Sequence, residues 1–237
     1  MISFFNKKQK VHVDCFTYFN GITKLFPIQY AHEIQPSWFK EVPTSTKSQS
    51  GATVATVRTC PGMQELFKKG IVIPSWCDLY VNSNNNAIQT EPAEMAESHP
   101  TWQWNNHVAL KDYMHLKIAS PWKFKEKTGV NFLFTNVFWG NTTDQYFVPN
   151  GLVEYKYQNT TNINMWVRKT FAKKEFTISA GTPLAQIIPL EDKEIVIHMH
   201  EIDEKEYVGD ELDYIFTQTG QYYKRKKILS KKGTIKE

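Results

Sequence analysis

The chain has 237 residues, of which 41% are hydrophobic and 14% aromatic, so it can bury a sizeable core and is too apolar for a disordered protein. Its net charge of +4 is modest, and much of the excess lies in residues 222–237, so nucleic acid is not expected as a partner of the whole surface. No apolar stretch reaches the roughly 18 residues of a membrane span, and no signal peptide is recognisable at the N-terminus. We therefore expect a cytoplasmic protein.

The cysteines point to the same reducing compartment. Cys15, Cys60 and Cys77 are widely spaced and form no Cys-x-x-Cys pair. Reduced, buried thiols are therefore expected rather than disulfides. A nucleophilic role for Cys77 would need a neighbouring base, which the sequence does not identify.

Predicted strands are segments rich in β-branched and aromatic side chains that end at turn residues. In chain order they cover residues 11–19, 54–59, 71–81 with a break at Pro74, 102–107, 116–118, 121–124, 131–139, the two flanks of 158–162, 176–178, 184–190 and 195–202. So many short strands predict an all-β fold.

Few segments favour a helix. Pro61 stands at the first position of a helix predicted over 61–69, and Gly70 is well placed to end it. Residues 34–43 are expected to form one helical turn, and apolar residues at helical spacing predict a closing helix over 210–223.

These elements predict one domain with a tail. Residues 1–221 are expected to form a single β-rich domain, interrupted by polar insertions at 44–51 and 82–101. The basic segment 222–237 is expected to be a solvated tail or to dock onto a neighbouring subunit.

Four segments, in this order along the chain, resemble the motifs of one enzyme superfamily. Three of them read SWCDLYV at 75–81, NGLVEYKY at 150–157 and FTISAGTPLAQIIP at 176–189, and the fourth is the predicted strand-turn-strand at 120–134. They are similar to motifs of the dUTPase and dCTP deaminase superfamily, whose members are small β-rich nucleotide enzymes that usually assemble as trimers. The resemblance implies a dUTPase-like β-clip or distorted barrel with insertions, a nucleotide or other small molecule as ligand, and a homo-oligomer, with a trimer favoured.

The whole chain also resembles uncharacterised proteins of marine tailed phages. The shared elements are PSWFK at 36–40, IVIP at 71–74 and GTPLAQ at 181–186. This resemblance implies a phage-type protein in the cytoplasm of an infected host cell.

The superfamily resemblance also implies site residues. Glu154 stands where the family carries an Asp that orients or activates water, which makes it the candidate general base. Asp78, in the first motif, is the second candidate catalytic residue, because one carboxylate can position a hydrated Mg²⁺ ion. The residues that the resemblance places at the ligand are Tyr157, Gly151, Gln186, Tyr80 and Asn136.

Each assignment has a structural alternative. Asp78 can cap a turn at a strand end. Glu154 and Tyr157 can be ordinary edge-strand residues, because residues three apart share a strand face only where a bulge intervenes. The match around Gly181 and Gln186 is a signal of strand-turn-strand structure and supports the fold rather than catalysis.

Two departures from the family pattern argue against turnover. Thr135, Asn136 and Val137 replace an Arg-Ser-Ser motif, which removes a phosphate-binding guanidinium, and the Gly-rich arm that closes over phosphates is missing. We therefore expect the protein to bind or sequester a nucleotide. A nucleotide hydrolase or deaminase with Glu154 as its base, and a virion structural or assembly protein, are the alternatives.

Two further patterns have residue types that suit ligand chemistry. His198 and His200 share one face of a predicted strand, as two ligands of one metal ion would, but no third ligand is evident and no metal site is predicted. Several tryptophans could stack on bases, although core or subunit contacts are the simpler interpretation. These tryptophans are Trp102, Trp104, Trp122, Trp139 and Trp166.

Overall fold

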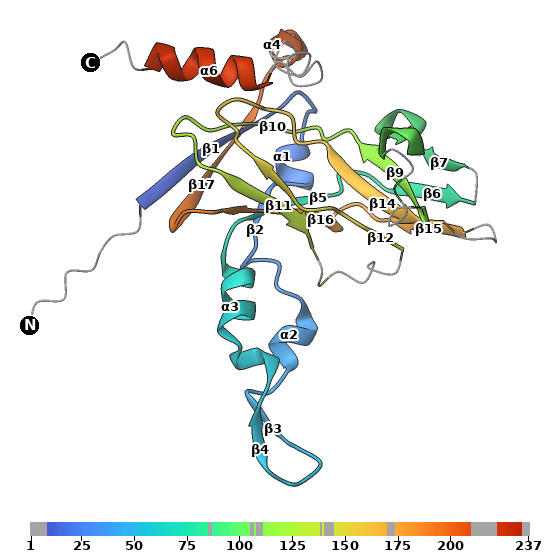
Figure 1. The fold of residues 1–237 in the computed structure, drawn as a ribbon, viewed down its shortest axis with the longest axis vertical. Coiled ribbons are helices and arrows are strands. Elements are labelled where there is room, and N and C mark those ends of the chain that lie inside the picture. Colours follow the sequence, from blue (N-terminus) through green and yellow to red (C-terminus); the bar gives the residue numbers. More distant parts are fainter. Residues whose placement is uncertain are drawn as a thin grey trace, which may run out of the picture.

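The computed structural model describes residues 9–84, 87–104, 107, 111–137, 139, 145–169, 174–209 and 222–233. Within these ranges seventeen strands form five sheets, and the helices are short (Figure 1). This confirms the predicted β-rich fold with a few short helices.

The strands have the following bounds in chain order. They are β1 (Gln9–Thr17), β2 (Gln29–Tyr30), β3 (Ser45–Lys47), β4 (Thr53–Ala55), β5 (Ile71–Pro74), β6 (Leu79–Ser83), β7 (Ile88–Glu91), β8 (Ala96–His99), β9 (Tyr113–Ile118), β10 (Lys123–Lys125), β11 (Phe132–Asn136), β12 (Tyr146–Phe147), β13 (Gly151–Val153), β14 (Ile163–Arg168), β15 (Lys174–Ile178), β16 (Pro183–Pro189) and β17 (Lys193–Glu201).

The helices fall into two types. The α-helices are α1 (Ile22–Leu25), α2 (Ser37–Glu41), α3 (Pro61–Lys68), α4 (Glu204–Gly209) and α6 (Tyr222–Gly233), and the 3-10 helices are η1 (Val57–Thr59), η2 (Ala93–Met95) and η3 (Thr101–Trp104). The basic segment that was expected to be a tail therefore contains the longest of them, α6.

Each sheet has two edge strands, so within the described ranges none closes on itself. The strand orders are β10-β1-β17, β13-β11-β16-β5-β2, β12-β14-β9-β8, β15-β6-β7 and β3-β4. Strands β1 and β17 pair in parallel along their whole length, from Gln9 opposite Lys193 to Thr17 opposite Glu201. The two ends of the described body are therefore held side by side.

The main core lies between the sheets and follows from the alternation of the strands. In β1, Val11, Val13 and Cys15 are fully buried while the residues between them reach the surface. All four residues of β5 are buried, because this strand lies between β16 and β2. Burying a side chain such as Phe132 contributes about 1.5 to 3 kcal/mol, so this core is the main source of stability.

Residues 31–70 form an arm that projects from the sheets and carries α2, α3 and the hairpin β3–β4 (Figure 1). A second, smaller core holds it, in which the rings of Phe39 and Trp139 pack on Phe67. The six residues of the hairpin strands are all exposed. The prediction of a loop over 44–51 was therefore wrong in part, because residues 45–47 pair with 53–55.

The arm joins the body at Gly70, where the two backbones touch. Gly70 has a φ of +87°, and a Cβ on it would lie 2.2 Å from the carbonyl oxygen of Ile187 in β16. Only glycine combines this conformation with this approach.

Two predictions were wrong around the second predicted insertion, one of a polar loop and one of a strand. Residues 87–101 contain β7 and β8, each paired with a neighbouring strand, but their side chains are at most half-buried, so the segment is too polar to be recognised as strand. Residues 102–107 alternate like a strand, yet Thr101–Trp104 is a 3-10 helix in which Trp104 packs on Trp166. Most of the closing helix predicted at 210–223 lies outside the described residues.

Candidate functional site

Asp78 stabilises a turn through a hydrogen bond to the backbone. It follows Pro74 and the buried turn of the first motif, and its Oδ1 accepts a hydrogen bond of 2.8 Å from the backbone N–H of Ala180. The same turn is closed by hydrogen bonds between Ser75 and the backbone of Gly181 and Thr182. Asp78 therefore caps the turn before β16, which is the alternative to a Mg²⁺-positioning role.

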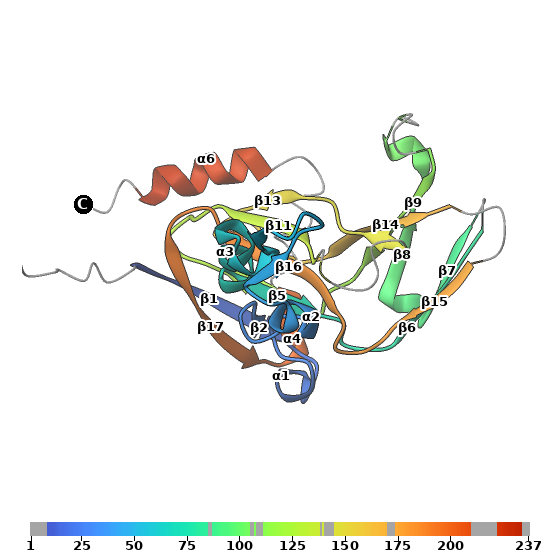
Figure 2. The ribbon, with the colours of Figure 1, turned by 90° about the horizontal axis from the view of Figure 1, so that it is seen from below.

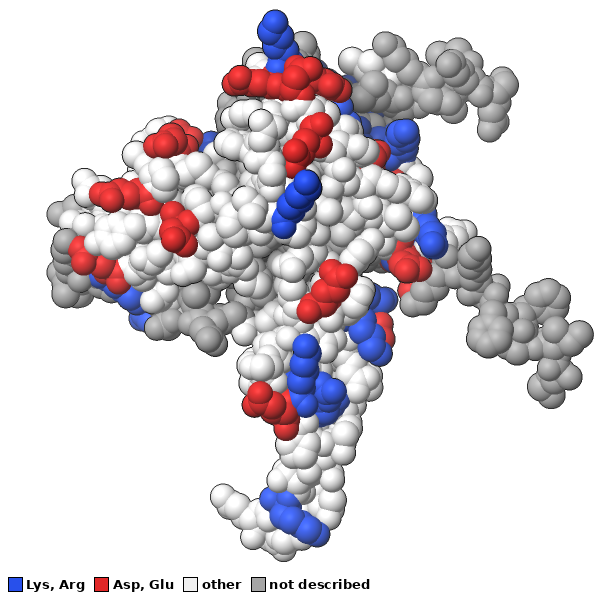
Figure 3. All heavy atoms as spheres, turned by 180° about the vertical axis from the view of Figure 1, so that it is seen from behind, with Lys and Arg blue, Asp and Glu red and all other residues white. Residues whose placement is uncertain are grey.

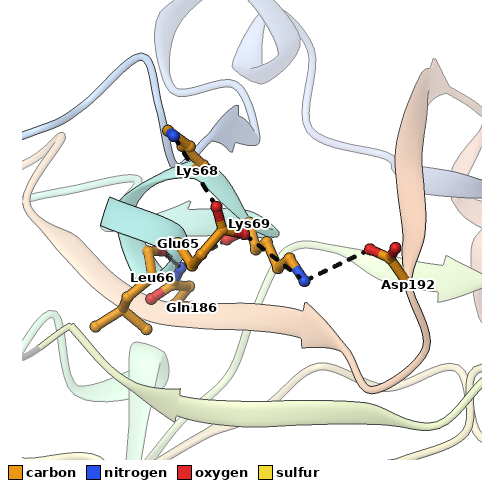
Figure 4. Close-up of polar contacts among 6 residues, drawn as sticks. All are labelled: Glu65, Leu66, Lys68, Lys69, Gln186 and Asp192. Carbon is orange, nitrogen blue, oxygen red and sulfur yellow. Dashed lines mark hydrogen bonds and ion pairs between the residues drawn. The ribbon is translucent and has the colours of Figure 1, made fainter. Parts of the chain in front are cut away.

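Gln186 is fully buried and joins the arm to the body (Figure 4). Its Nε2 donates to the carbonyl oxygens of Leu66 at 2.9 Å and Lys69 at 2.8 Å, two groups at the C-terminal end of α3. The last carbonyls of a helix have no partner within the helix, so this amide supplies one. The match that suggested a ligand-binding Gln186 thus marks a packing contact.

Asn136 and Tyr80 are also engaged by protein groups. Asn136 Oδ1 accepts from the backbone N–H of Val148 at 3.2 Å. The hydrogen bond of Tyr80 to Glu175 raises the pKa of its phenol to about 12, which keeps Tyr80 protonated. Tyr80 lines a hollow of about 490 Å³ over β6 and β7, and Asn136 lines none of the hollows described below.

Glu154 and Tyr157 are brought together by a helical turn. The backbone N–H groups of Tyr157 and Gln158 both bond to the carbonyl oxygen of Glu154, so residues three apart share a face. Helix α6 lies beside this turn (Figure 2), and Lys226 Nζ bonds to the Glu154 carboxylate and lies 5.6 Å from the centre of the Tyr157 ring. The side chain of Glu154 is only 12% exposed.

The two candidate catalytic carboxylates do not meet. Asp78 caps the turn at the start of β16, whereas Glu154 follows Val153, whose partner Phe132 pairs with Pro189 at the other end of β16. The seven residues of that strand span about 20 Å at about 3.3 Å per residue. Asp78 and Glu154 therefore cannot act on one substrate bond in this conformation.

A hollow of about 640 Å³ opens instead between η2, β8, β10 and α4. We call it the aromatic hollow, because five aromatic side chains contribute to its wall. Of these, Phe19 is 39% exposed and Trp122 is almost fully buried. The aromatic residues are Tyr18, Phe19, Trp76, Trp122 and Tyr207.

A second hollow of about 470 Å³ adjoins the first. We call it the amide hollow, because Asn150, Gln158, Asn162 and Asn164 line it together with Gly151. The two hollows share Lys117 and residues 160–162, so they meet along this loop. Both volumes are typical of small-molecule sites.

The loop at the junction is held in place by its own side chains. Thr161 is buried and donates to the backbone carbonyl of Trp122, and the Asn162 side chain accepts from the backbone N–H of Ser120. The sequence predicts residues 158–162 only as an Asn-Thr cluster between two strands. The clustering of amide and hydroxyl side chains there was the available signal of a polar site.

The asparagines of the amide hollow use their oxygens within the protein. Asn150 accepts from Thr135, Asn162 accepts from Ser120, and Asn164 bonds to His115. In the part of the chain that the structure describes, these side-chain bonds engage Oδ1 alone. The amino groups are therefore the donors that a ligand with acceptor atoms would meet.

One charge pair stands where the hollows meet. Lys117 Nζ lies 2.7 Å from a carboxylate oxygen of Glu97, and the hydrogen bond to Lys117 lowers the pKa of Glu97. Burial also lowers the pKa of His115, which stands two residues before Lys117 in β9. A pair of opposite charges leaves this part of the cleft close to neutral.

The cysteines carry no sign of catalytic activation. All three are free thiols; Cys15 is buried as predicted, whereas Cys60 is exposed and that part of the prediction was wrong. Burial raises the pKa of Cys77, which disfavours the thiolate that a nucleophile needs.

On the face shown in Figure 3, acidic and basic side chains of the described residues are interspersed and form no continuous basic surface. The described ranges contain no group of three or more side chains arranged to hold a metal ion. Among the helices in those ranges, none has the length and apolar character to cross a bilayer.

A scan against known protein families finds no match for this chain, and a search of curated proteins finds no match either.

Proposed function

We propose that this protein binds a nucleotide through its base and sugar, in the cleft formed by the aromatic and amide hollows, and holds it without turning it over. The observation that carries the proposal is the junction at residues 160–162, where stacking surfaces and amide donors adjoin. Bases offer flat faces to aromatic rings and acceptor atoms to amide groups, so the two walls suit one ligand.

The surroundings of Glu97 and Glu154 support binding over catalysis. Glu97 is paired with Lys117, and its lowered pKa makes it a weaker base. Glu154 and Tyr157 contribute to neither hollow. The enzyme alternative, with Glu154 as general base, would require Lys226 to move from the carboxylate that it contacts.

The basic side chains of the cleft can bind few phosphate groups. Lys117 is paired with Glu97, and Lys123 is buried with its Nζ 2.5 Å from the carbonyl oxygen of Tyr207. This agrees with the missing Arg-Ser-Ser motif and makes a nucleoside or monophosphate a better fit than a triphosphate.

The resemblance to the dUTPase and dCTP deaminase superfamily also supports a nucleotide as the ligand. Gly151 begins β13 and Gly181 precedes β16, and both strands pair with β11, as motifs of one scaffold should. A phage-type protein that assembles as a homotrimer in the host cytoplasm belongs to the same proposal.

A second candidate function is an assembly or virion component. The observation that favours it is the hairpin β3–β4, which projects from the body with both strands exposed (Figure 1). An isolated two-stranded hairpin is at best marginally stable in water, so a partner surface would stabilise it. Detection of the protein in purified particles by mass spectrometry would support this function.

Calorimetric titration with deoxynucleosides, deoxynucleotides and cyclic dinucleotides tests the proposal. Phe19→Ala should weaken binding by about 1 to 3 kcal/mol, the contribution of stacking one base on an aromatic ring. Trp38→Ala is the matched control, because Trp38 is also 39% exposed but lies on the arm. Absence of heat with every compound would end the proposal, and product formation that Glu154→Gln abolishes would establish the enzyme alternative.

A further inference from the structure

The paired strands β1 and β17 carry a second group of functional side chains, none of which lines the aromatic or the amide hollow. Because the two strands are parallel and in register, their even-numbered residues share the face opposite the buried Val11 and Val13. Charged groups on this face are Lys10, Asp14 and Glu194, with Lys123 and Lys125 on the adjacent strand β10. The face also holds His12, His198 and His200.

His12 and His198 point at each other across the two strands. The distance between His12 Nδ1 and His198 Nε2 is 2.8 Å, and the ring planes differ by only 10°. Such a contact joins two nitrogen atoms through one proton, which one ring donates to the lone pair of the other. Two imidazole nitrogens are thus already directed at one point.

His200 has different partners. Its Nε2 lies 2.9 Å from Asp14 Oδ1, and its ring stacks on Phe16 with 4.9 Å between the ring centres. The pair suggested by spacing in the sequence, His198 with His200, is therefore divided between two sets of contacts. The pair that the fold creates is His12 with His198.

We propose that His12 and His198 together bind one divalent transition-metal ion that prefers nitrogen ligands, such as Zn²⁺ or Cu²⁺. Two nitrogens on a tetrahedral Zn²⁺ at about 2.05 Å stand about 3.3 Å apart, so the side chains need to separate by only about 0.5 Å from the observed contact. The proton between the rings moves to the other nitrogen of its own ring, and both directed lone pairs go to the metal.

Water completes the coordination, because the described residues offer no third ligand at this point. The affinity is therefore lower than that of structural zinc sites, which have four protein ligands. The ion joins the first strand of the body to the last one, and a ligand of the native state raises its thermal stability.

The test is a titration of the full-length protein, free of any histidine tag, with ZnCl₂ by calorimetry and with CuCl₂ by electron paramagnetic resonance. We expect one ion per chain, a Cu²⁺ spectrum with two imidazole nitrogens and a rise in Tm with Zn²⁺. His12→Ala and His198→Ala should each weaken binding at least about tenfold.

The matched control is His200→Ala, which removes a histidine of the same strand face and should leave the affinity within about twofold of the original, since His200 is held by Asp14 and Phe16. Circular dichroism of each variant verifies that the fold is intact. Equal losses in His200→Ala and His198→Ala, or the absence of any saturable binding by the folded protein, would overturn the proposal. His12 and His198 line neither hollow of the cleft, so either proposal can fail without the other.

Discussion

Amide side chains serve opposite purposes in two regions of this molecule. At the junction under α3, Gln186 is fully buried and both of its amide hydrogen bonds go to the helix end of the arm. In the amide hollow, Gln158 and Asn164 lie beside an open volume and retain donors for another molecule. The chemical type of a residue therefore does not locate a site; the burial of its side chain and the partners of its donor groups do.

The largest effect on stability is expected from a substitution at Gly70, where the arm joins the body. Gly70→Ala places a Cβ against the Ile187 carbonyl and forces an unfavourable φ, so we expect a loss of about 3 to 5 kcal/mol in the free energy of unfolding. Urea denaturation measures it. Gly151→Ala is the control, because nothing lies within 4 Å of its added Cβ and its stability should change little.

Gln186→Met tests the buried amide itself at nearly constant side-chain volume. It leaves the carbonyls of Leu66 and Lys69 without their donor, and we expect a loss of about 2 to 4 kcal/mol in stability. Ligand affinity in the variant that remains folded should be unchanged. A variant of normal stability that no longer binds nucleotide would instead return Gln186 to the binding site.

Gln158→Ala makes the corresponding change in the open region, with the reverse expectation. Stability should change by less than about 0.5 kcal/mol, while loss of one hydrogen bond should weaken nucleotide binding roughly tenfold. Gln35→Ala provides the comparison, because Gln35 is also half-buried but precedes α2 on the arm. Equal affinities in the two variants would argue against the amide hollow as the ligand site.

The smallest expected effects are on the pH dependence of stability. The first of them concerns Glu97, at the rim of the cleft. The pKa of Glu97 is lowered from its ordinary value of 4.5 by the bond to Lys117, so its contribution is fully present above pH 4.5 and is lost as the pH falls through the lowered value. Denaturation curves of the wild type and Glu97→Gln should converge over that interval. Curves that stay parallel down to the lowest pH would show that the pair contributes nothing.

His115 adds a second dependence near the cleft. Burial lowers its pKa from 6.5, so the unfolded state binds the proton more readily and stability should fall as the pH drops below 6.5. His115→Gln should reduce this slope in denaturation experiments.

Local sequence patterns identify the fold class and several elements. Alternation of apolar residues in 11–19 and the apolar run at 184–190 correspond to β1 and β16, and Pro61 begins α3 as predicted. These predictions succeeded because backbone periodicity and helix-end preferences are local properties. They failed at β7 and β8, whose side chains are not buried deeply enough to be apolar.

Which side chains act together follows from the long-range packing of the chain. It separated Asp78 from Glu154 by the length of β16, set Gln186 into the end of α3, and placed His12 against His198 although they stand 186 residues apart in the chain. Sheet register and strand order set these neighbours, and they depend on long-range pairing that no local pattern encodes. The residues carry their chemistry in the sequence, but the partners that complete a site are chosen by packing.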